Sequence, residues 1–456
     1  MKDLLNVLIG IASTPALLVA LIAVIGLILQ KKSISNILQG GIKTFVGFLV
    51  LTGGAGIVQS SLTPFGEMFK HAFSVTGVVP NNEAIVALAL TKYGTPTALI
   101  MLVGMVVNIL IARFTRFKYI YLTGYATLYM SCMIAVIMSV SGFTTVPLIL
   151  LGGLILGMAN ALSPAILQPF IKSVTGTNDI AMGHTGNFGY MISAVIGKLF
   201  GNKSRSTEDL KVPKGLSFLR DSTVAIAITM GIIYVILAIF AGKGYIEAKL
   251  SDGTNFIIYA IQMAGTFAAG VFVILSGVRL ILGEIIPAFK GISEKLVPNS
   301  KPALDCPIVF PYAPNAVLIG FFSSFVGGIV SMFIMIAFHT VIVLPGVVPH
   351  FFCGATAGVF GNATGGRRGA ILGSFIQGIV ISFMPLALMP VLGNLGFANS
   401  TFSDTDYGVV GLFLGGLGTT GGIVMITTGI FAVLAIMLLL TVFKKKPVNT
   451  DTVVKK

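Results

Sequence analysis

Residues 47–64 read GFLVLTGGAGIVQSSLTP, and residues 270–287 read GVFVILSGVRLILGEIIP. The first stretch lies within the charge-free run Thr44–Gly66. That run is long enough for a helix to cross the hydrocarbon core of a bilayer, which takes about 20 apolar residues. Laid on each other, the two stretches match at four positions, including Gly47 with Gly270 and Gly54 with Gly277, each 223 residues apart. They predict a membrane-spanning helix that occurs twice in the chain.

Apolar runs continue over the rest of the sequence. Hydrophobic residues make up 55% of the 456 residues and charged residues only 10%, whereas soluble domains carry about a quarter charged residues. We therefore expect an all-α polytopic membrane protein with about eleven membrane-spanning helices. The other runs that supply them are Leu4–Gln30, Tyr93–Ala112, Tyr119–Ile171, Ser222–Gly242, Thr254–Val278, Cys306–Gly366, Gly369–Leu392 and Tyr407–Phe443.

The net charge of +14 comes from short basic patches between these runs. Such patches mark the cytoplasmic side of a membrane protein, so they do not indicate nucleic-acid binding. If the chain changes sides at each crossing, one choice of starting side places nearly all of these patches inside. That choice puts the N-terminus outside and the C-terminus in the cytoplasm. The patches placed inside include Lys31, Lys32, Lys43, Arg113, Arg116, Lys118, the cluster from Lys198 to Arg220, Arg279, Arg367, Arg368 and Lys444–Lys446.

The same assignment of membrane sides makes the two repeated segments cross the membrane in opposite directions. A second match, YGTPTALI from Tyr93 with YAPNAVLI from Tyr312, supports the repeat at nearly the same spacing. We expect two inverted repeats, which in solute carriers place the substrate site between the halves. The first repeat covers about 1–220 and the second about 221–405, within one membrane-embedded unit, and a final helix with a cytoplasmic tail covers 406–456.

Three segments within the long runs are too rich in Pro, Gly, Asn and Thr for a uniform lipid-facing helix. They are GMANALSP from Gly157, PYAPNAV from Pro311 and GVVPHFFCGATAGVFGNATGG from Gly346. Backbone that leaves the helix at membrane depth must find partners in protein or water. These segments predict re-entrant hairpins or a cavity lining, with short extramembrane loops as the alternative.

Ionisable groups inside a membrane are costly and usually functional. Asp305 opens the longest uncharged run, and its counterpart 223 residues earlier is Asn82, with Glu83 beside it. We expect these polar loops to converge on a solute, although Asp305 could instead cap a helix. His184, followed by Thr185 in a glycine-rich loop, is a further candidate because imidazole can donate to a polyol or enolate oxygen.

No motif indicates catalysis or a cofactor. The chain has no GxxxxGK[ST] phosphate loop, so ATP hydrolysis is not expected. Cys132, Cys306 and Cys353 are widely spaced in apolar sequence, which is typical of small buried side chains rather than a disulfide framework or a metal site. We expect no cofactor and no metal.

Several ordered blocks resemble a known family. KKSISNILQGGIKTFVGFLVLTGGAGIV, STEDLKVPKGLSFLRD, FKGISEKLVP and DCPIVFPYAPNAV are similar to the ascorbate-type IIC permease of the bacterial phosphoenolpyruvate-dependent sugar phosphotransferase system. The resemblance implies a homodimer in which a dimerising domain flanks a substrate-carrying core domain. It also implies that the core delivers its solute to a cytoplasmic IIB protein carrying phosphocysteine, which IIA supplies with phosphate. The chain is then a transport component in the cell membrane and not an enzyme alone.

The resemblance also implies binding residues. The family's GH-x-x-x-F histidine falls on His184 and its DC block aspartate on Asp305. Other contacts depart from the family pattern: Tyr125 and Tyr129 stand where the family has His and Gln, and Thr185 replaces Gln. Asn82 and Glu83 replace a Thr-Tyr pair. Glu83 adds a negative charge, which would repel an ascorbate anion. The solute, ascorbate or another sugar or polyol, therefore stays open.

A different class of protein also fits the sequence. An ion-coupled secondary carrier of a small polar solute would use Asp305 or Glu83 as its coupling site. Measuring uptake of the solute in cells that lack the general phosphocarriers distinguishes the phosphotransferase permease from the ion-coupled carrier.

Overall fold

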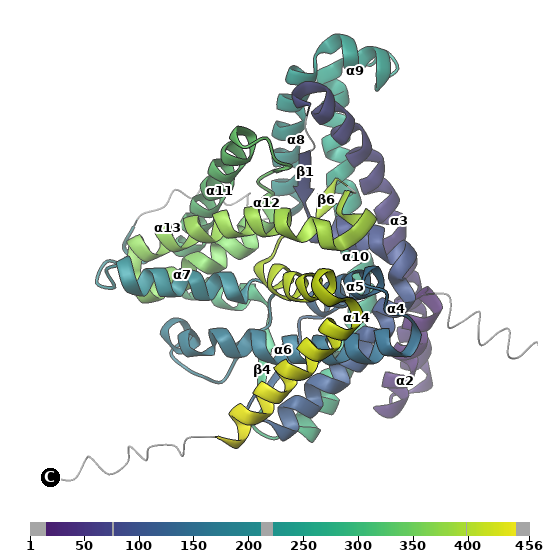
Figure 1. The fold of residues 1–456 in the computed structure, drawn as a ribbon, viewed down its shortest axis with the longest axis vertical. Coiled ribbons are helices and arrows are strands. Elements are labelled where there is room, and N and C mark those ends of the chain that lie inside the picture. The colour runs from purple at the N-terminus through teal and green to yellow at the C-terminus, as the bar shows by residue number, and fades with distance from the viewer. Residues whose placement is uncertain (1–14, 75–76, 211–221, 398, 444–456) are drawn as a thin grey trace, which may run out of the picture.

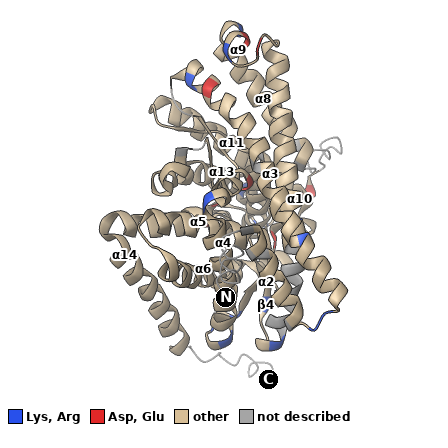
Figure 2. Ribbon diagram, turned by 90° about the vertical axis from the view of Figure 1, so that its right-hand side faces the viewer, with Lys and Arg blue, Asp and Glu red and all other residues tan. Residues whose placement is uncertain are grey.

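The computed structural model describes residues 15–74, 77–210, 222–397 and 399–443, which are predominantly helical (Figure 1). Both chain ends, whose orientation we predicted, lie outside the described residues. So do Lys444–Lys446 and the part of the basic cluster within 211–221. Charged side chains are sparse along the long helices (Figure 2), as expected for surfaces that face lipid.

Three long helices lie side by side, and together with α2 (Pro15–Leu29) they form what we call the long-helix layer (Figure 1). They are α3 (Ile34–Phe73), α8 (Ser222–Ala241) and α10 (Phe256–Leu296). The short helix α9 (Lys243–Lys249) follows α8 after a bend of 100°. A Ser33 hydroxyl that accepts from the Asn36 amide caps the start of α3, a typical helix N-cap.

Glycines set the crossing of α3 and α10. A Cβ atom on Gly277 would lie 2.5 Å from the carbonyl oxygen of Gly47, and a Cβ on Gly54 would lie 3.1 Å from that of Gly270. Only glycine allows two backbones to approach this closely. The two stretches that match in sequence therefore lie against each other, with Gly47 beside Gly277 and Gly54 beside Gly270.

The other helices form the core layer. They are α4 (Asn82–Phe114), α5 (Gly124–Val140), α6 (Thr145–Thr175), α7 (Asn187–Phe200), α11 (Pro314–Ala337), α12 (Val347–Pro349), α13 (Ala355–Leu388) and α14 (Thr405–Val442), with a π-turn at His350–Gly354 and 3₁₀ turns at Thr207–Asp209, Cys306–Tyr312 and Met389–Phe397. Two of these helices are broken at glycines with positive φ: Gly366 (φ 59°) divides α13, and Gly422 (φ 57°) divides α14. Such backbone favours glycine, so the breaks fall where the sequence permits them.

Six short strands, which we did not predict, hold the centre of the core layer together. They are β1 (Gly77–Pro80), β2 (Tyr119–Tyr121), β3 (Ala181–Met182), β4 (Lys301–Leu304), β5 (Ile342–Val343) and β6 (Ser400–Thr401). They form two parallel sheets with the orders β5-β1-β6 and β2-β4-β3. Each sheet therefore joins segments that are far apart in the chain.

The multi-pass helical class is confirmed. Among the described residues, seven helices are long and apolar enough to cross a membrane, or eight if the bent pair Ile226–Ala241 and Lys243–Lys249 counts as one span. Helix α5 is apolar but shorter. The count of eleven and the division into a core and a dimerising domain stay predictions.

Candidate functional site

A cavity of about 200 Å³ lies between the core layer and the long-helix layer. Its polar wall comes from the core layer, and its lining there includes Asn82, Glu83, Tyr125, His184, Asp305 and Asp404. The opposite wall is largely apolar and comes from α8 and α10, with Ile226, Val271, Leu275, Val278 and the exposed Arg279. Val348, Pro349 and Phe352 complete the lining.

The short strands explain why these polar residues meet. Each polar lining residue of the core layer lies within four residues of the carboxyl end of a strand, as Asn82 follows β1 and His184 follows β3. Carboxyl ends of parallel strands meet at one edge of a sheet, where small-molecule sites commonly form. The two sheets thus bring together residues that come from both halves of the chain.

Asp305 both caps a helical turn and lines the cavity. Its Oδ1 accepts a hydrogen bond from the Cys306 amide at 2.7 Å and another from the Tyr125 hydroxyl at 2.8 Å. The capping role that the sequence allowed is therefore present, and contact of Asp305 with a solute stays a prediction. The second oxygen, Oδ2, has no hydrogen-bond partner within the described part of the chain and can accept from a ligand hydroxyl.

Asp404 is the site residue that the sequence analysis missed. It stands at the N-cap of α14 but makes no capping bond with its side chain. Its Oδ1 accepts from Asn82 Nδ2 and from Ser403 Oγ, both at 2.8 Å, and its Oδ2 accepts from Thr185 Oγ1 at 2.5 Å. A buried carboxylate with three side-chain donors fixes the loops that carry them.

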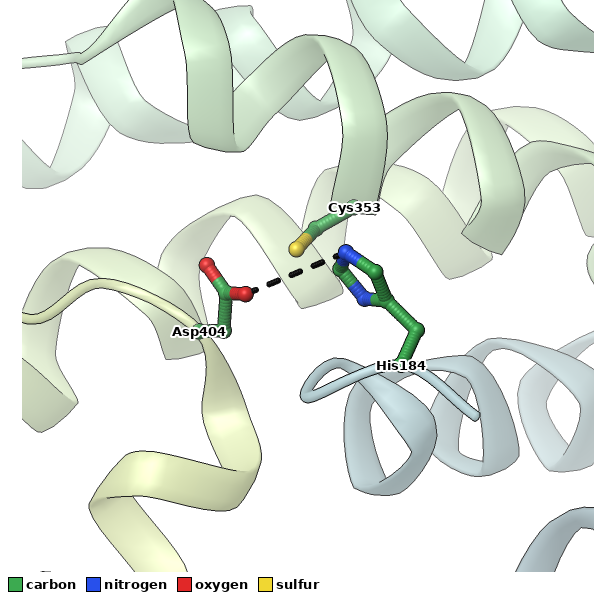
Figure 3. A group of neighbouring side chains, drawn as sticks. All are labelled: His184, Cys353 and Asp404. Atoms are coloured by element: carbon green, nitrogen blue, oxygen red, sulfur yellow. Dashed lines mark ion pairs between the residues drawn. The ribbon is translucent and has the colours of Figure 1, made fainter. Parts of the chain in front are cut away.

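His184 presents a proton toward Asp404. The amide of Gly186 donates to Nδ1 at 3.1 Å, so this nitrogen is an acceptor and the proton of the neutral ring is on Nε2. The Tyr190 hydroxyl lies 2.6 Å from the same Nδ1. Nε2 lies 4.0 Å from Asp404 Oδ2 (Figure 3), which leaves the N–H group available to a ligand in the cavity.

The same side chains come close to forming a metal-binding set. Ligand atoms of His184, Cys353 and Asp404 lie within 4.8 Å of one another (Figure 3), and so do those of His184, Asp305 and Cys306. A neutral histidine that binds metal through Nε2 needs a proton on Nδ1, where the Gly186 N–H group points. The hydrogen bonds of His184 therefore do not fit a metal centre.

Glu83 is a buried carboxyl group on the cavity wall, with 9% of its surface exposed. Its Oε2 has no hydrogen-bond partner among the described residues. A buried polar atom without a partner is uncommon and calls for a ligand, a water or a proton. Glu83 thus leaves one buried carboxyl oxygen of the cavity wall without a partner in the described part of the chain.

Five of the seven residues that we named from the sequence line this cavity: Asn82, Glu83, Tyr125, His184 and Asp305. Tyr129 lies behind it, 1% exposed, with its ring centroid 5.8 Å from that of Tyr125. Thr185 does not line the cavity, but its hydroxyl donates a hydrogen bond to Asp404, which does. That any of the seven contacts a substrate stays a prediction.

Fold and cavity together define a multi-pass helical membrane protein with a cavity between two helical layers, one wall of which is polar. The family model EIIC-GAT, described as the sugar-specific permease component of the PTS system, matches residues 10–406, and the chain belongs to this family. The family resemblance drawn from the sequence is therefore confirmed, and a permease component is not an enzyme by itself.

A curated relative is the protein named "Ascorbate-specific PTS system EIIC component" from Mycoplasma pneumoniae (strain ATCC 29342 / M129 / Subtype 1). It is 28% identical over 426 residues, which cover 81% of this chain and 64% of the relative. The match thus spans less than two thirds of that relative's length.

Proposed function

We propose that this chain binds an external sugar, polyol or ascorbate-like molecule and carries it to a cytoplasmic IIB protein, which phosphorylates it during transport. Family membership supports the transport mode. The named relative supports ascorbate as the first solute to test. In this proposal the N-terminus is outside, the C-terminus is in the cytoplasm, and IIA supplies IIB with phosphate.

One observation carries the proposal: apart from Arg279 of α10, the polar groups of the cavity belong to the core layer, while α8 and α10 supply a mostly apolar surface. A solute held by the core can therefore move with it, because few polar contacts tie the solute to the long-helix layer. We take the long-helix layer as the dimerising domain and the core layer as the moving, substrate-carrying domain of a homodimer.

The strand pairing supports the inverted repeat. A twofold relation between the halves would pair each strand of one half with a strand of the other: β1 with β4, β2 with β5 and β3 with β6. Under this exchange the strand order β5-β1-β6 becomes β2-β4-β3, which is the order of the other sheet. The register is kept, since the pair Gly77–Ile342 becomes Lys301–Tyr119. The contacts of Gly47 with Gly277 and of Gly54 with Gly270 are likewise exchanged by such a twofold relation.

This relation adjusts two details of the predicted repeat. Gly77 and Lys301 are 224 residues apart, so Asp305 corresponds to Asn81 rather than to Asn82. Asn81 also caps a helix, with its side chain accepting from the Ala84 amide. The start of α14 corresponds to α7, so we end the second repeat near the break at Gly421–Gly422 instead of at residue 405.

The chemistry of the cavity favours an uncharged solute. Glu83, Asp305 and Asp404 offer carboxylate oxygens that accept hydrogen bonds from hydroxyl groups, and His184 offers one N–H donor. An anion would meet several like charges where water is largely excluded, and Arg279 is the one arginine or lysine among the described lining residues. Valine and leucine of α10 suit the apolar face of a sugar ring.

Binding of ascorbate, pentoses, hexoses and pentitols to the purified protein tests the proposal. We expect saturable binding of at least one of them, lost in both Asp305→Asn and His184→Ala. Binding of ascorbate alone would assign the relative's solute to this chain. Binding that survives both substitutions would remove these residues from the site.

Ion coupling is the second candidate, because the unpartnered oxygen of Glu83 on the cavity wall could carry a proton. Uptake in cells lacking the general phosphocarriers distinguishes the two. Loss of accumulation supports phosphotransfer. Retained accumulation that disappears when the proton gradient is collapsed, and also in Glu83→Gln, supports ion coupling.

A further inference from the structure

A second cavity, of about 250 Å³, lies between α5, α6, α7 and α14 and has no lining residue in common with the polar cavity. Its walls are mostly apolar, with Met158, Leu162, Phe413 and Val433 among the lining residues. Val433 comes from the part of α14 beyond the glycine break. An engineered apolar cavity of about 150 Å³ is large enough to bind benzene, so this one has room for a substituted ring.

Two polar side chains that line this cavity, Asn160 and Tyr121, make no side-chain hydrogen bond among the described residues, and only Asn160 carries both a donor and an acceptor group on an amide. Asn160 is 5% exposed and lines the cavity, and its amide group makes no hydrogen bond within the described ranges. The neighbouring Asp406, by contrast, accepts from Ser163 Oγ at 2.5 Å and from the Phe188 amide at 2.9 Å. Burying an amide without a partner is unfavourable, so Asn160 points to a ligand that can hydrogen-bond to it.

We propose that this second cavity binds a small apolar molecule bearing one hydroxyl group, of the class of the alkylphenols, with the hydroxyl on Asn160. The amide can both donate to and accept from a hydroxyl. A sugar or polyol does not suit the apolar walls, which would leave most of its hydroxyls unpaired. A lipid acyl chain fills the apolar part but leaves Asn160 without a partner. The proposal does not depend on which solute the polar cavity takes.

The chain contains no tryptophan, so one introduced tryptophan, excited where tyrosine and phenols absorb little, reports binding without a signal from other tryptophans. Phe413→Trp places the reporter on the cavity wall. Phe333→Trp, at a position on α11 that is 61% exposed, reports nonspecific partition into detergent or lipid. The two probes are p-ethylphenol and p-ethyltoluene, which differ in shape very little but only one of which has a hydroxyl.

We expect p-ethylphenol to change the Phe413→Trp fluorescence saturably and to bind roughly 3- to 10-fold more tightly than p-ethyltoluene, the effect of one net hydrogen bond. Adding Asn160→Leu should abolish this preference while leaving p-ethyltoluene binding in place. Wild-type protein provides a second measurement, in which p-ethylphenol raises the thermal unfolding midpoint more than p-ethyltoluene does.

Three results would overturn the proposal. Equal affinity for the two probes would mean an apolar cavity that does not recognise a hydroxyl, as for an acyl chain. A preference that persists in Asn160→Leu would place the hydroxyl elsewhere. A linear, unsaturable response that Phe333→Trp shows equally would mean partition into the detergent or lipid only.

Discussion

Asp404 accepts hydrogen bonds from three side chains at the polar cavity, and Asp404→Asn tests the importance of these bonds directly. The substitution keeps the shape of the side chain and removes its charge. The amide oxygen can still accept from Asn82 and Ser403, but the amide nitrogen then faces the Thr185 hydroxyl, which must turn around. A hydrogen bond to a charged group contributes about 1.5–3 kcal/mol and a neutral one about 1 kcal/mol.

Weakening three hydrogen bonds in this way would cost several kcal/mol of free energy. Part of this loss is recovered, because burying an amide costs less free energy than burying a carboxylate. We expect a net loss of about 1–3 kcal/mol in solute binding, which is roughly a 5- to 150-fold weaker Kd. Isothermal titration with the solute identified by the binding panel measures it.

Asp406→Asn is the matched control. Asp406 lies two residues further along, in the first turn of α14, is similarly buried and lines the other cavity. It should leave solute affinity within about 3-fold of wild type, the range of an indirect effect of less than about 1 kcal/mol. Wild-type affinity in Asp404→Asn, together with loss of binding in Asp406→Asn, would refute the assignment of Asp404 to the polar site.

Two further predictions follow from contacts described above. Tyr125→Phe removes the hydroxyl bonded to Asp305 at 2.8 Å and should weaken solute binding about 10-fold, whereas Tyr129→Phe, whose hydroxyl has no partner among the described residues, should not; titration of both variants checks this. Gly277→Val should lower the thermal unfolding midpoint and the yield of monodisperse protein, because its side chain would enter α3, at a cost of about 1–3 kcal/mol or more; Gly265→Val on the same helix, with open space around it, is the control.

The helical membrane class could be read from the sequence because hydrophobicity over 20 or more residues is a strong local signal. The strands could not be read in the same way. Each is two to four residues long, as in Ala181–Met182 or Ser400–Thr401, which is too short to show a period of two. They exist because partners from the other half of the chain complete their hydrogen bonds, and such pairing has no local signature.

The site shows the same division between local and distant information. Asp305 and His184 stood out because a single ionisable group in a long apolar run is conspicuous. Asp404 did not, because it directly precedes the run that forms the last helix, where an acidic residue is an ordinary helix N-cap. The signal that could have identified it is the FSDTD segment from Phe402, which ends in α14 as GHTGN from Gly183 ends in α7.

Hydrogen bonds at the cavity join the two halves of the chain. Asn82 and Asp404 are hydrogen-bonded across 322 residues of sequence, and Tyr125 and Asp305 across 180. In both pairs one partner lies in each half, and the first half supplies the donor to a carboxylate of the second half. A shift of one half relative to the other would separate both pairs at once, leaving buried groups unpaired, which is costly. The polar wall of the cavity therefore belongs to one rigid unit, which is what the proposed carriage of a solute past the apolar surface of α8 and α10 requires.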